Sequence, residues 1–294
     1  DGTSWRVTYT VQAGDDAKAS PAGIAGLVLW LDASNVDGQN NTTLSNGASV
    51  SEWTDLSGNQ NHAVQNNNTK KPVLQTNKVK FTYSENDILI SPVNIDSTVM
   101  DQLTVFAVFN IESNDHMGVW GQDDGAWDRF LWFNNGTHGN INWGPIGSGL
   151  SDGTTGLAVI DNFDGDFSDP ANQGLMLTES YYDEDQTNGS GFYLNGKLRK
   201  QFTANNNSGR SDFIIGSYDM SERTFGGNIV EIIVINTKVD TTTRSKINYY
   251  LSKKWNLTTT VDSDGDGFTD AVEKGYETIP TDNMSFPSGL PSVL

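Results

Sequence analysis

Residues 192–198, FYLNGKL, place an Asn-Gly pair between two runs of strand-forming residues. Asn and Gly adopt the positive φ angles of a two-residue hairpin turn at little cost, so this stretch predicts two antiparallel strands joined by a tight turn. The hairpin indicates that the surrounding chain is built from antiparallel sheet.

Short apolar runs of the same kind recur along the chain between turns rich in Gly, Asn, Asp and Ser. Val, Ile, Phe, Tyr and Trp dominate these runs, and such residues fit a pleated, half-buried surface. Their spacing predicts an all-β sandwich or barrel. The runs are 27–31, 103–110, 117–121, 130–133, 156–160, 191–194, 213–216 and 229–235.

One helix is expected after the last of these runs, at residues 245–255 with a lead-in at 240–244. Four positions of this segment fall on one helical face, which predicts packing against the sheet. The threonines at 241–243 can cap the helix. The positions on the packed face are Ile247, Tyr250, Leu251 and Lys254/Trp255.

Changes in composition divide the chain into three parts. Residues 1–20 are expected to be the tail of a preceding domain, or an edge strand followed by a linker, because large and polar residues alternate over 5–12. Residues 21–257 carry the strand runs and the helix, and they are expected to form one ligand-binding domain. Residues 258–294 hold an acidic repeat and a tail rich in Pro and Ser.

The charge balance restricts the partners of this chain. It has 294 residues, with 18 Lys+Arg against 37 Asp+Glu and a net charge of −19. A nucleic-acid partner is excluded because binding a phosphate backbone requires a basic face, and an anionic membrane surface is disfavoured for the same reason. The chain has no cysteine, which excludes disulfides and thiolate metal sites. No apolar run approaches membrane-spanning length, so membrane insertion is not expected.

The acidic repeat matches a calcium-binding loop of the EF-hand type at every required position. Residues 262–273 read DSDGDGFTDAVE, with Gly267 at the position of the sharp turn. The alternative is a disordered acidic tail. A structural rather than regulatory role is expected, since the preceding residues 258–261 read as extended. The expected metal ligands are Asp262, Asp264, Asp266, the Phe268 carbonyl, Asp270 and Glu273.

A second group of acids lies in the middle of the chain, at Asp123, Asp124 and Asp128. Their charges repel one another unless a cation or a base compensates them. Gly125 lets the chain turn sharply enough for the carboxylates to converge, and calcium accepts roughly six to eight oxygens in irregular geometry. A solvated turn in which Arg129 pairs with one aspartate is the alternative, and the residues alone leave both open.

Four tryptophans, Trp120, Trp127, Trp132 and Trp143, flank this acidic loop. Exposed indole rings would form a stacking platform for a sugar or an aromatic side chain. For any single one of them, a place in the core is the favoured interpretation.

Several segments together resemble the laminin-G-like, concanavalin A-like modules of large bacterial surface proteins. The resemblance covers about residues 24–257 and implies a two-sheet antiparallel jelly-roll sandwich with one C-terminal helix. The acidic loop 262–273 resembles the calcium repeats of thrombospondin type 3. The segments that carry the module resemblance are 26–34, 50–59, 61–63, 192–197, 225–236 and 249–255.

A finer resemblance lies at residues 120–130, WGQDDGAWDRF. This stretch is similar to the ligand loop of calcium-dependent peptide-binding modules in bacterial RTX-type adhesins. The resemblance implies that Asp123, Asp124 and Asp128 bind calcium, which in turn grips a peptide or protein on another cell. It also implies a monomeric module of a larger secreted or cell-surface chain. The implied ligand-binding residues are Gln122, Asp123, Asp124, Gly125, Trp127, Asp128 and Arg129.

Catalytic patterns are not found in the sequence, and no catalytic residue is predicted. Glu231 lies in a strand run whose i±2 neighbours, Ile229 and Ile233, are apolar, so the paired carboxylates of a glycoside hydrolase are not evident. The three histidines have no zinc-site spacing. We therefore expect a binding module and not an enzyme. The other hypotheses are a carbohydrate-binding module, a calcium-stiffened spacer and, less favoured, a polysaccharide hydrolase or lyase.

Overall fold

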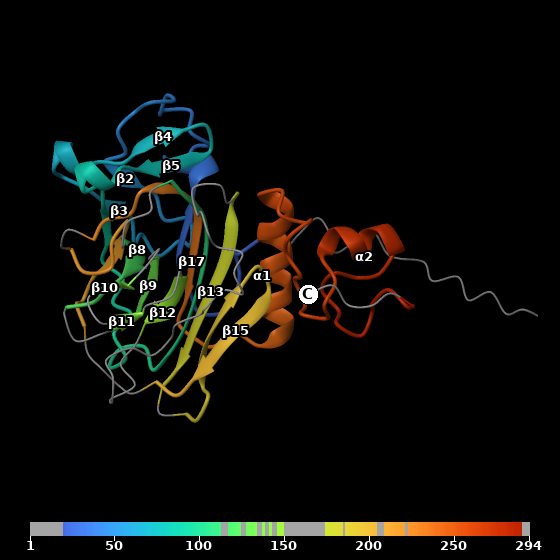
Figure 1. Ribbon diagram of the computed structural model, residues 1–294. Coiled ribbons are helices and arrows are strands. Elements are labelled where there is room, and N and C mark those ends of the chain that lie inside the picture. Colours follow the sequence, from blue (N-terminus) through green and yellow to red (C-terminus); the bar gives the residue numbers. More distant parts are fainter. Residues whose placement is uncertain are drawn as a thin grey trace, which may run out of the picture.

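A computed structural model of the protein describes residues 20–112, 117–124, 128–133, 137–138, 141–142, 146–149, 174–184, 186–204, 209–220 and 223–289. These residues form two antiparallel sheets that pack face to face, with two helices on one side of the sandwich (Figure 1). The helices are α1 (Thr241–Lys254) and α2 (Asp270–Tyr276). Neither helix of the described part is long and apolar enough to cross a membrane.

The larger sheet has eight described strands, in the order β15-β14-β13-β7-β17-β5-β4, with β1 also paired to β17. All pairings within it are antiparallel. Its strands are β1 (Leu27–Asp32), β4 (Val73–Gln75), β5 (Lys78–Phe81), β7 (Gln102–Ile111), β13 (Met176–Asp183), β14 (Ser190–Leu194), β15 (Lys197–Phe202) and β17 (Gly227–Ile235).

The second sheet has seven described strands, in the order β12-β9-β8-β16-β6-β3-β2. A separate pair, β10 (Thr137–His138) and β11 (Ile141–Asn142), lies outside both sheets. Three short 3₁₀ helices, Ala33–Asn35, Asn68–Lys70 and Tyr83–Glu85, complete the described elements. The strands of the second sheet are β2 (Glu52–Trp53), β3 (Ala63–Val64), β6 (Leu89–Ser91), β8 (Met117–Gly121), β9 (Phe130–Phe133), β12 (Ile146–Gly149) and β16 (Phe213–Ile215).

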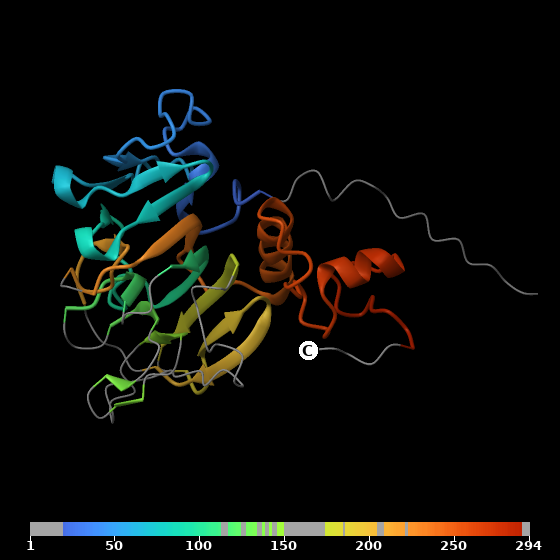
Figure 2. The ribbon, with the colours of Figure 1, turned by 45° about the horizontal axis from the view of Figure 1, so that its top comes forward.

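The core lies between the sheets and extends to helix α1. Strand β17 is buried along its whole length, which is why its sequence is a nearly continuous apolar run. Phe225, just before β17, packs edge-on against Phe81 and Phe109. Ile247 and Leu251 of α1 belong to the same cluster of buried side chains, so the helix is part of the domain (Figure 2).

The predicted all-β, two-sheet antiparallel sandwich with a C-terminal helix is confirmed. The Asn-Gly turn joins β14 to β15, with φ of +50° at Asn195 and +82° at Gly196. Helix α1 begins slightly earlier than predicted, and its cap is Asp240, which accepts a hydrogen bond from the Thr243 amide. The predicted strands at 5–12 and 156–160 lie outside the described residues.

Candidate metal centres

The first candidate centre lies where strands β8 and β9 meet. These strands are antiparallel neighbours, and the Gln122 amide donates to the Arg129 carbonyl at 3.2 Å where the pairing ends. The connection is therefore short, and it holds the three predicted aspartates in one place. Asp123, Asp124 and Asp128 each offer a carboxylate oxygen, and these atoms lie within 4.8 Å of one another.

Two side chains of this centre are fully buried and have polar atoms without hydrogen-bond partners among the described residues. The first is Asp128, whose Oδ2 accepts from the Asp124 amide at 3.1 Å while Oδ1 accepts nothing. The second is Gln122, in which neither the amide oxygen nor the amide nitrogen is bonded. Burial, together with repulsion from Asp123 and Asp124, raises the pKa of the Asp128 carboxyl to about 7. A cation at this point would relieve both the cost of burying these groups and the repulsion between the carboxylates.

Three residues that sequence reasoning missed form the walls of the centre. Asp96 accepts from the Gly209 amide at 2.7 Å, and the Tyr218 carbonyl accepts from the Asp123 amide at 2.8 Å. A Cβ at Gly209 would lie 2.7 Å from the Asp128 carboxylate, so only glycine fits there without displacing that side chain. These residues come from distant loops, and no local motif marks them.

Arg129 supports the loop from behind. Its side chain is buried, bonds the Glu184 carboxylate at 2.7 Å, and donates to the Ile95 carbonyl at 2.7 Å. It also lies over the Tyr182 ring. Arg129 therefore holds the neighbouring loop in place and is not exposed to a ligand, and it pairs with none of the three aspartates.

The flanking tryptophans divide into two groups. Trp120 and Trp132 are fully buried, and the Trp120 ring stacks on Phe213 with centroids 5.6 Å apart. These two rings belong to the core, as the favoured interpretation predicts. Trp127 and Trp143 lie outside the described residues, as does the predicted ligand residue Gly125.

The second candidate centre is the acidic loop at 262–273. Carboxylate oxygens of Asp262, Asp264 and Asp266 lie within 4.8 Å of one another. The Asp262 carboxylate accepts from the Gly265 amide at 2.7 Å and the Gly267 amide at 2.9 Å. Gly267 has a φ of +99°, which makes the sharp turn that its position in the motif requires.

The later positions of this loop differ in their surroundings. Glu273 is fully buried, and its Oε2 has no described hydrogen-bond partner; burial and repulsion by Asp264 raise its pKa to about 9. Asp270 instead accepts from the Ser263 amide at 3.0 Å and from the Ser252 hydroxyl. Phe268 is buried, and its amide donates to Asp266 at 2.8 Å. Both centres thus offer oxygen donors to a metal ion.

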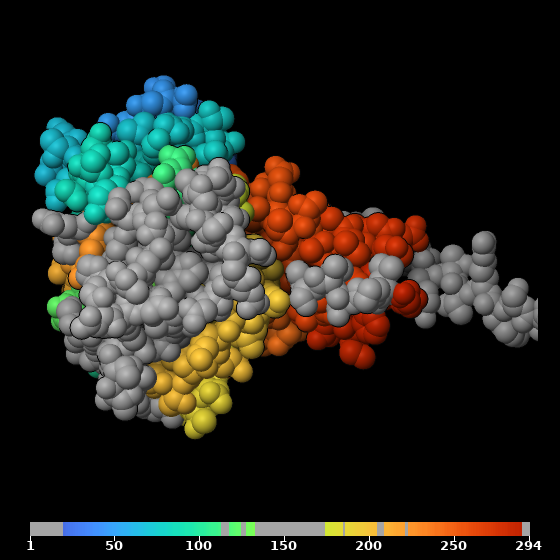
Figure 3. All heavy atoms as spheres, in the orientation of Figure 1, coloured from blue at the N-terminus to red at the C-terminus, as the bar shows by residue number. Residues whose placement is uncertain are grey.

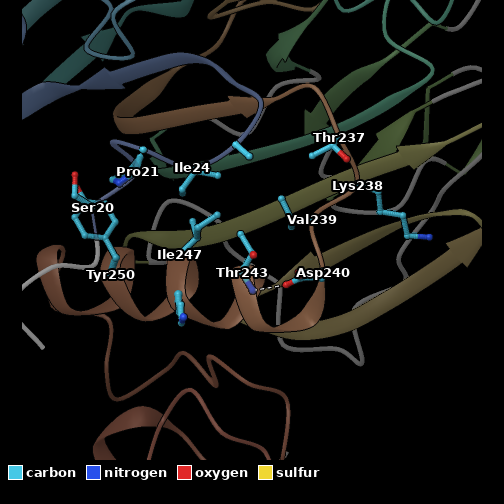
Figure 4. A pocket seen from close by; sticks show the side chains of 13 residues that line it. Ser20, Pro21, Ile24, Thr237, Lys238, Val239, Asp240, Thr243, Ile247 and Tyr250 are labelled. Carbon is cyan, nitrogen blue, oxygen red and sulfur yellow. Dashed lines mark hydrogen bonds between the residues drawn. The ribbon is translucent and has the colours of Figure 1, made fainter. Parts of the chain in front are cut away.

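A pocket of about 510 Å³ lies away from both centres, between residues 20–25, the loop that follows β17, and α1 (Figure 4). Three of its polar side chains already form hydrogen bonds within the protein. Asp240 caps α1, the Tyr250 hydroxyl donates to Glu231 at 2.9 Å, and Lys238 donates to the Gly189 carbonyl at 2.8 Å. The pocket therefore offers little to orient a ligand.

Comparisons with known proteins found only solved structures of low similarity. No protein-family model and no curated protein matches the chain. A Trypanosoma rangeli sialidase in complex with sialic acid matches with a TM-score of 0.48 and 14% identity, over 78% of this chain and 33% of that one. A botulinum neurotoxin serotype D binding domain matches with a TM-score of 0.43 and 12% identity, over 79% of this chain and 52% of that one.

A second structure of the botulinum neurotoxin serotype D domain, in complex with N-acetylneuraminic acid, has a TM-score of 0.45 and 13% identity, over 78% and 51% of the two chains. At these TM-scores the likeness assigns no activity, ligand or residue role. The sheet order by itself shows the architecture. The protein is a jelly-roll-like β-sandwich module.

These comparisons correct one expectation. The prediction that the chain is not an enzyme is wrong as an exclusion, because the similar solved structures include sialidases, which are enzymes. The chain spans a third of the sialidase chain. Whether this chain has glycosidase activity therefore has to be measured.

Proposed function

We propose that this protein is a calcium-dependent ligand-binding module of a bacterial cell-surface adhesin, and that its ligand is a glycan. One observation carries the proposal: buried Asp128 and Gln122 present unbonded polar atoms beside Asp123 and Asp124. Such groups are costly in a folded protein unless a ligand compensates them.

The donors favour calcium over other metals. The centre contains carboxylates and no His, and the chain has no Cys, so the nitrogen and sulfur ligands that zinc prefers are missing from the described cluster. Calcium accepts irregular arrangements of oxygen, whereas magnesium demands near-octahedral geometry. Asp124 is exposed, so the centre opens to solvent at this side chain. A ligand oxygen can complete the coordination there.

Charge favours a neutral ligand. Three carboxylates around one divalent cation leave an excess negative charge, which repels a carboxylate ligand and accepts sugar hydroxyls. The arginines around the centre each form an ion pair with another acid, which neutralises part of their charge. The pairs are Arg129 with Glu184, Arg210 with Asp212, and Arg223 with Asp219. A glycan therefore fits the centre better than a peptide carboxylate does.

The proposal is tested by probing the full chain against a glycan array and a peptide library, each in calcium and in EDTA. We expect glycan binding that EDTA and Asp124→Ala both abolish. Peptide binding with the same calcium dependence would support the calcium centre, but it would show that the ligand is a peptide and not a glycan. Binding that survives EDTA would overturn the metal-bridged mechanism, and no binding to either panel would favour a structural spacer.

A further inference from the structure

The acidic loop at 262–273 is joined to the β-sandwich by the β14–β15 turn. The Asp262 amide donates to the Asn195 carbonyl at 3.2 Å. Gly196 lies so close that a Cβ there would be 1.6 Å from the Asp262 carbonyl oxygen. Asn195 is itself fixed to strand β13, because its side chain accepts from the Leu177 amide at 2.9 Å. The start of the loop thus rests directly on the larger sheet.

Helix α1 joins the same loop from the other side. Arg244 donates to the Asp264 carbonyl at 3.4 Å, and Asn248 donates to the Ser263 carbonyl at 3.5 Å. One turn further along, the Ser252 hydroxyl donates to the Asp270 carboxylate. Residues four apart lie on one face of a helix, so a single face of α1 grips the loop over successive turns.

Arg244 links all three parts. Its guanidinium lies 4.4 Å from the ring centroid of Tyr193 on β14, and the same side chain bonds the loop backbone. Arg244 is buried, and it attracts the buried carboxylate of Glu179 on β13. A contiguous set of contacts therefore runs from the sheet through α1 to the loop.

The loop also contains buried acids that the protein does not satisfy. Among the described residues, Asp264 Oδ2 and Glu273 Oε2 have no hydrogen-bond partner, and their side chains are 3% and 0% exposed. Asp266 Oδ2 is likewise unbonded. Without a cation, Asp264 and Asp266 repel each other across the space that the loop encloses, and Glu273 is buried there with Oε2 unbonded. The repulsion would push the loop open and break its contacts with α1 and the turn.

We infer that a calcium ion at 262–273 acts as a latch for the β-sandwich itself: its binding clamps α1 and the β14–β15 turn together, so its occupancy controls the stability of the entire domain. The loop is then an integral part of the fold and not a separate linker. Figure 1 shows α1 lying between the sheets and the segment that carries α2, and Figure 3 shows that segment extending from the side of the sandwich. The calcium site lies at this junction.

The inference is tested by calcium titration of the full chain carrying Gly196→Ala. Gly196 supplies no metal ligand, but its contact with Asp262 means that a methyl group there must shift the turn and the loop relative to each other. Coupling energies between sites correspond to roughly 5- to 150-fold in affinity, so we expect calcium affinity at the loop to fall by about ten-fold. The Asp124→Ala background removes the first centre from the titration.

The matched control is Gly47→Ala in the same background. Gly47 has a comparable φ, +89° against +82°, but a Cβ there meets nothing within 4 Å. It therefore reproduces the backbone strain without the contact, and calcium affinity is expected to be unchanged. If Gly196→Ala does not fold, Asn248→Ala serves in its place, since it removes one bond from α1 to the loop.

Thermal unfolding separates the remaining outcomes. Saturating calcium is expected to raise the Tm of the single main transition by roughly 5–10 °C, and Asp264→Asn is expected to abolish that shift. Calcium binding with unchanged affinity in both Gly196→Ala and Asn248→Ala would overturn the latch while retaining the metal site. If no calcium binding depends on Asp264, both the latch and the metal site at 262–273 are overturned.

Discussion

At the scale of single residues, one lysine of α1 compensates two buried carboxylates. Lys254 lies between two buried carboxylates, with Nζ 2.6 Å from Asp32 and 2.8 Å from Glu231. Asp32 and Glu231 face each other across strands β1 and β17. The sequence places Glu231 among apolar neighbours, and only the folded chain shows that a lysine on α1 compensates it.

Removing that lysine is expected to be costly. Lys254→Met would leave Asp32 and Glu231 facing each other without a cation, and breaking a buried pair in this way lowers the free energy of unfolding by about 3–5 kcal/mol. Urea denaturation checks this value. The double variant with Glu231→Gln should recover part of the loss, and equal stability of wild type and Lys254→Met would contradict this role.

Glu179 makes the folding stability of the domain depend on pH. Burial raises its pKa to about 8, against the attraction of Arg244 on α1, and Tyr181 and Tyr193 are the other titratable groups around it. Because the folded pKa lies above the unfolded value, this stabilising term is complete below about pH 4.5 and is lost as the pH rises through about 8.

Glu179→Gln is therefore expected to match the wild type near pH 5 and to exceed it in stability at pH 9. Urea denaturation at the two pH values, at one fixed calcium concentration, measures the difference. An advantage of the variant that is equal at both pH values would show that Glu179 does not titrate in this way.

At the scale of elements, the sequence predicts strands well where apolar residues are contiguous. Strands β8 and β9 begin and end at the predicted residues. Strand β13 was not predicted, because polar Thr178, Glu179 and Ser180 occupy its middle although all three are buried. Only their tertiary contacts, such as the attraction between Glu179 and Arg244, reveal that this polar stretch lies inside.

The helix cap provides an element-scale prediction. Asp240 accepts from the Thr243 amide at 2.7 Å, so Asp240→Ala should lower the free energy of unfolding by about 1 kcal/mol. Thr241→Ala is the control, since Thr241 is exposed and its side chain does not cap the helix. Chemical denaturation of both variants distinguishes Asp240 as the cap from the threonines that the sequence predicts. A greater loss of stability in Thr241→Ala than in Asp240→Ala would contradict the role of Asp240.

At the scale of the whole molecule, the sequence predicts the two acidic centres to different extents. The loop at 262–273 is local, so a motif within a single stretch reveals most of its donors. In the centre at Asp123, Asp124 and Asp128, only these three aspartates are close together in the sequence. Its walls at Asp96, Gly209 and Tyr218 are brought in by strands that are distant in sequence, and no spacing rule predicts them.

The central claim is that Asp123, Asp124 and Asp128 bind calcium. Isothermal titration of an EDTA-stripped sample with calcium, on wild type and on Asp124→Ala, tests it most directly. We predict two sites in the wild type and the loss of one in the variant, with the site at 262–273 retained. Identical titrations of the two proteins would contradict the claim, and the ligand site would then have to be sought elsewhere on the sandwich.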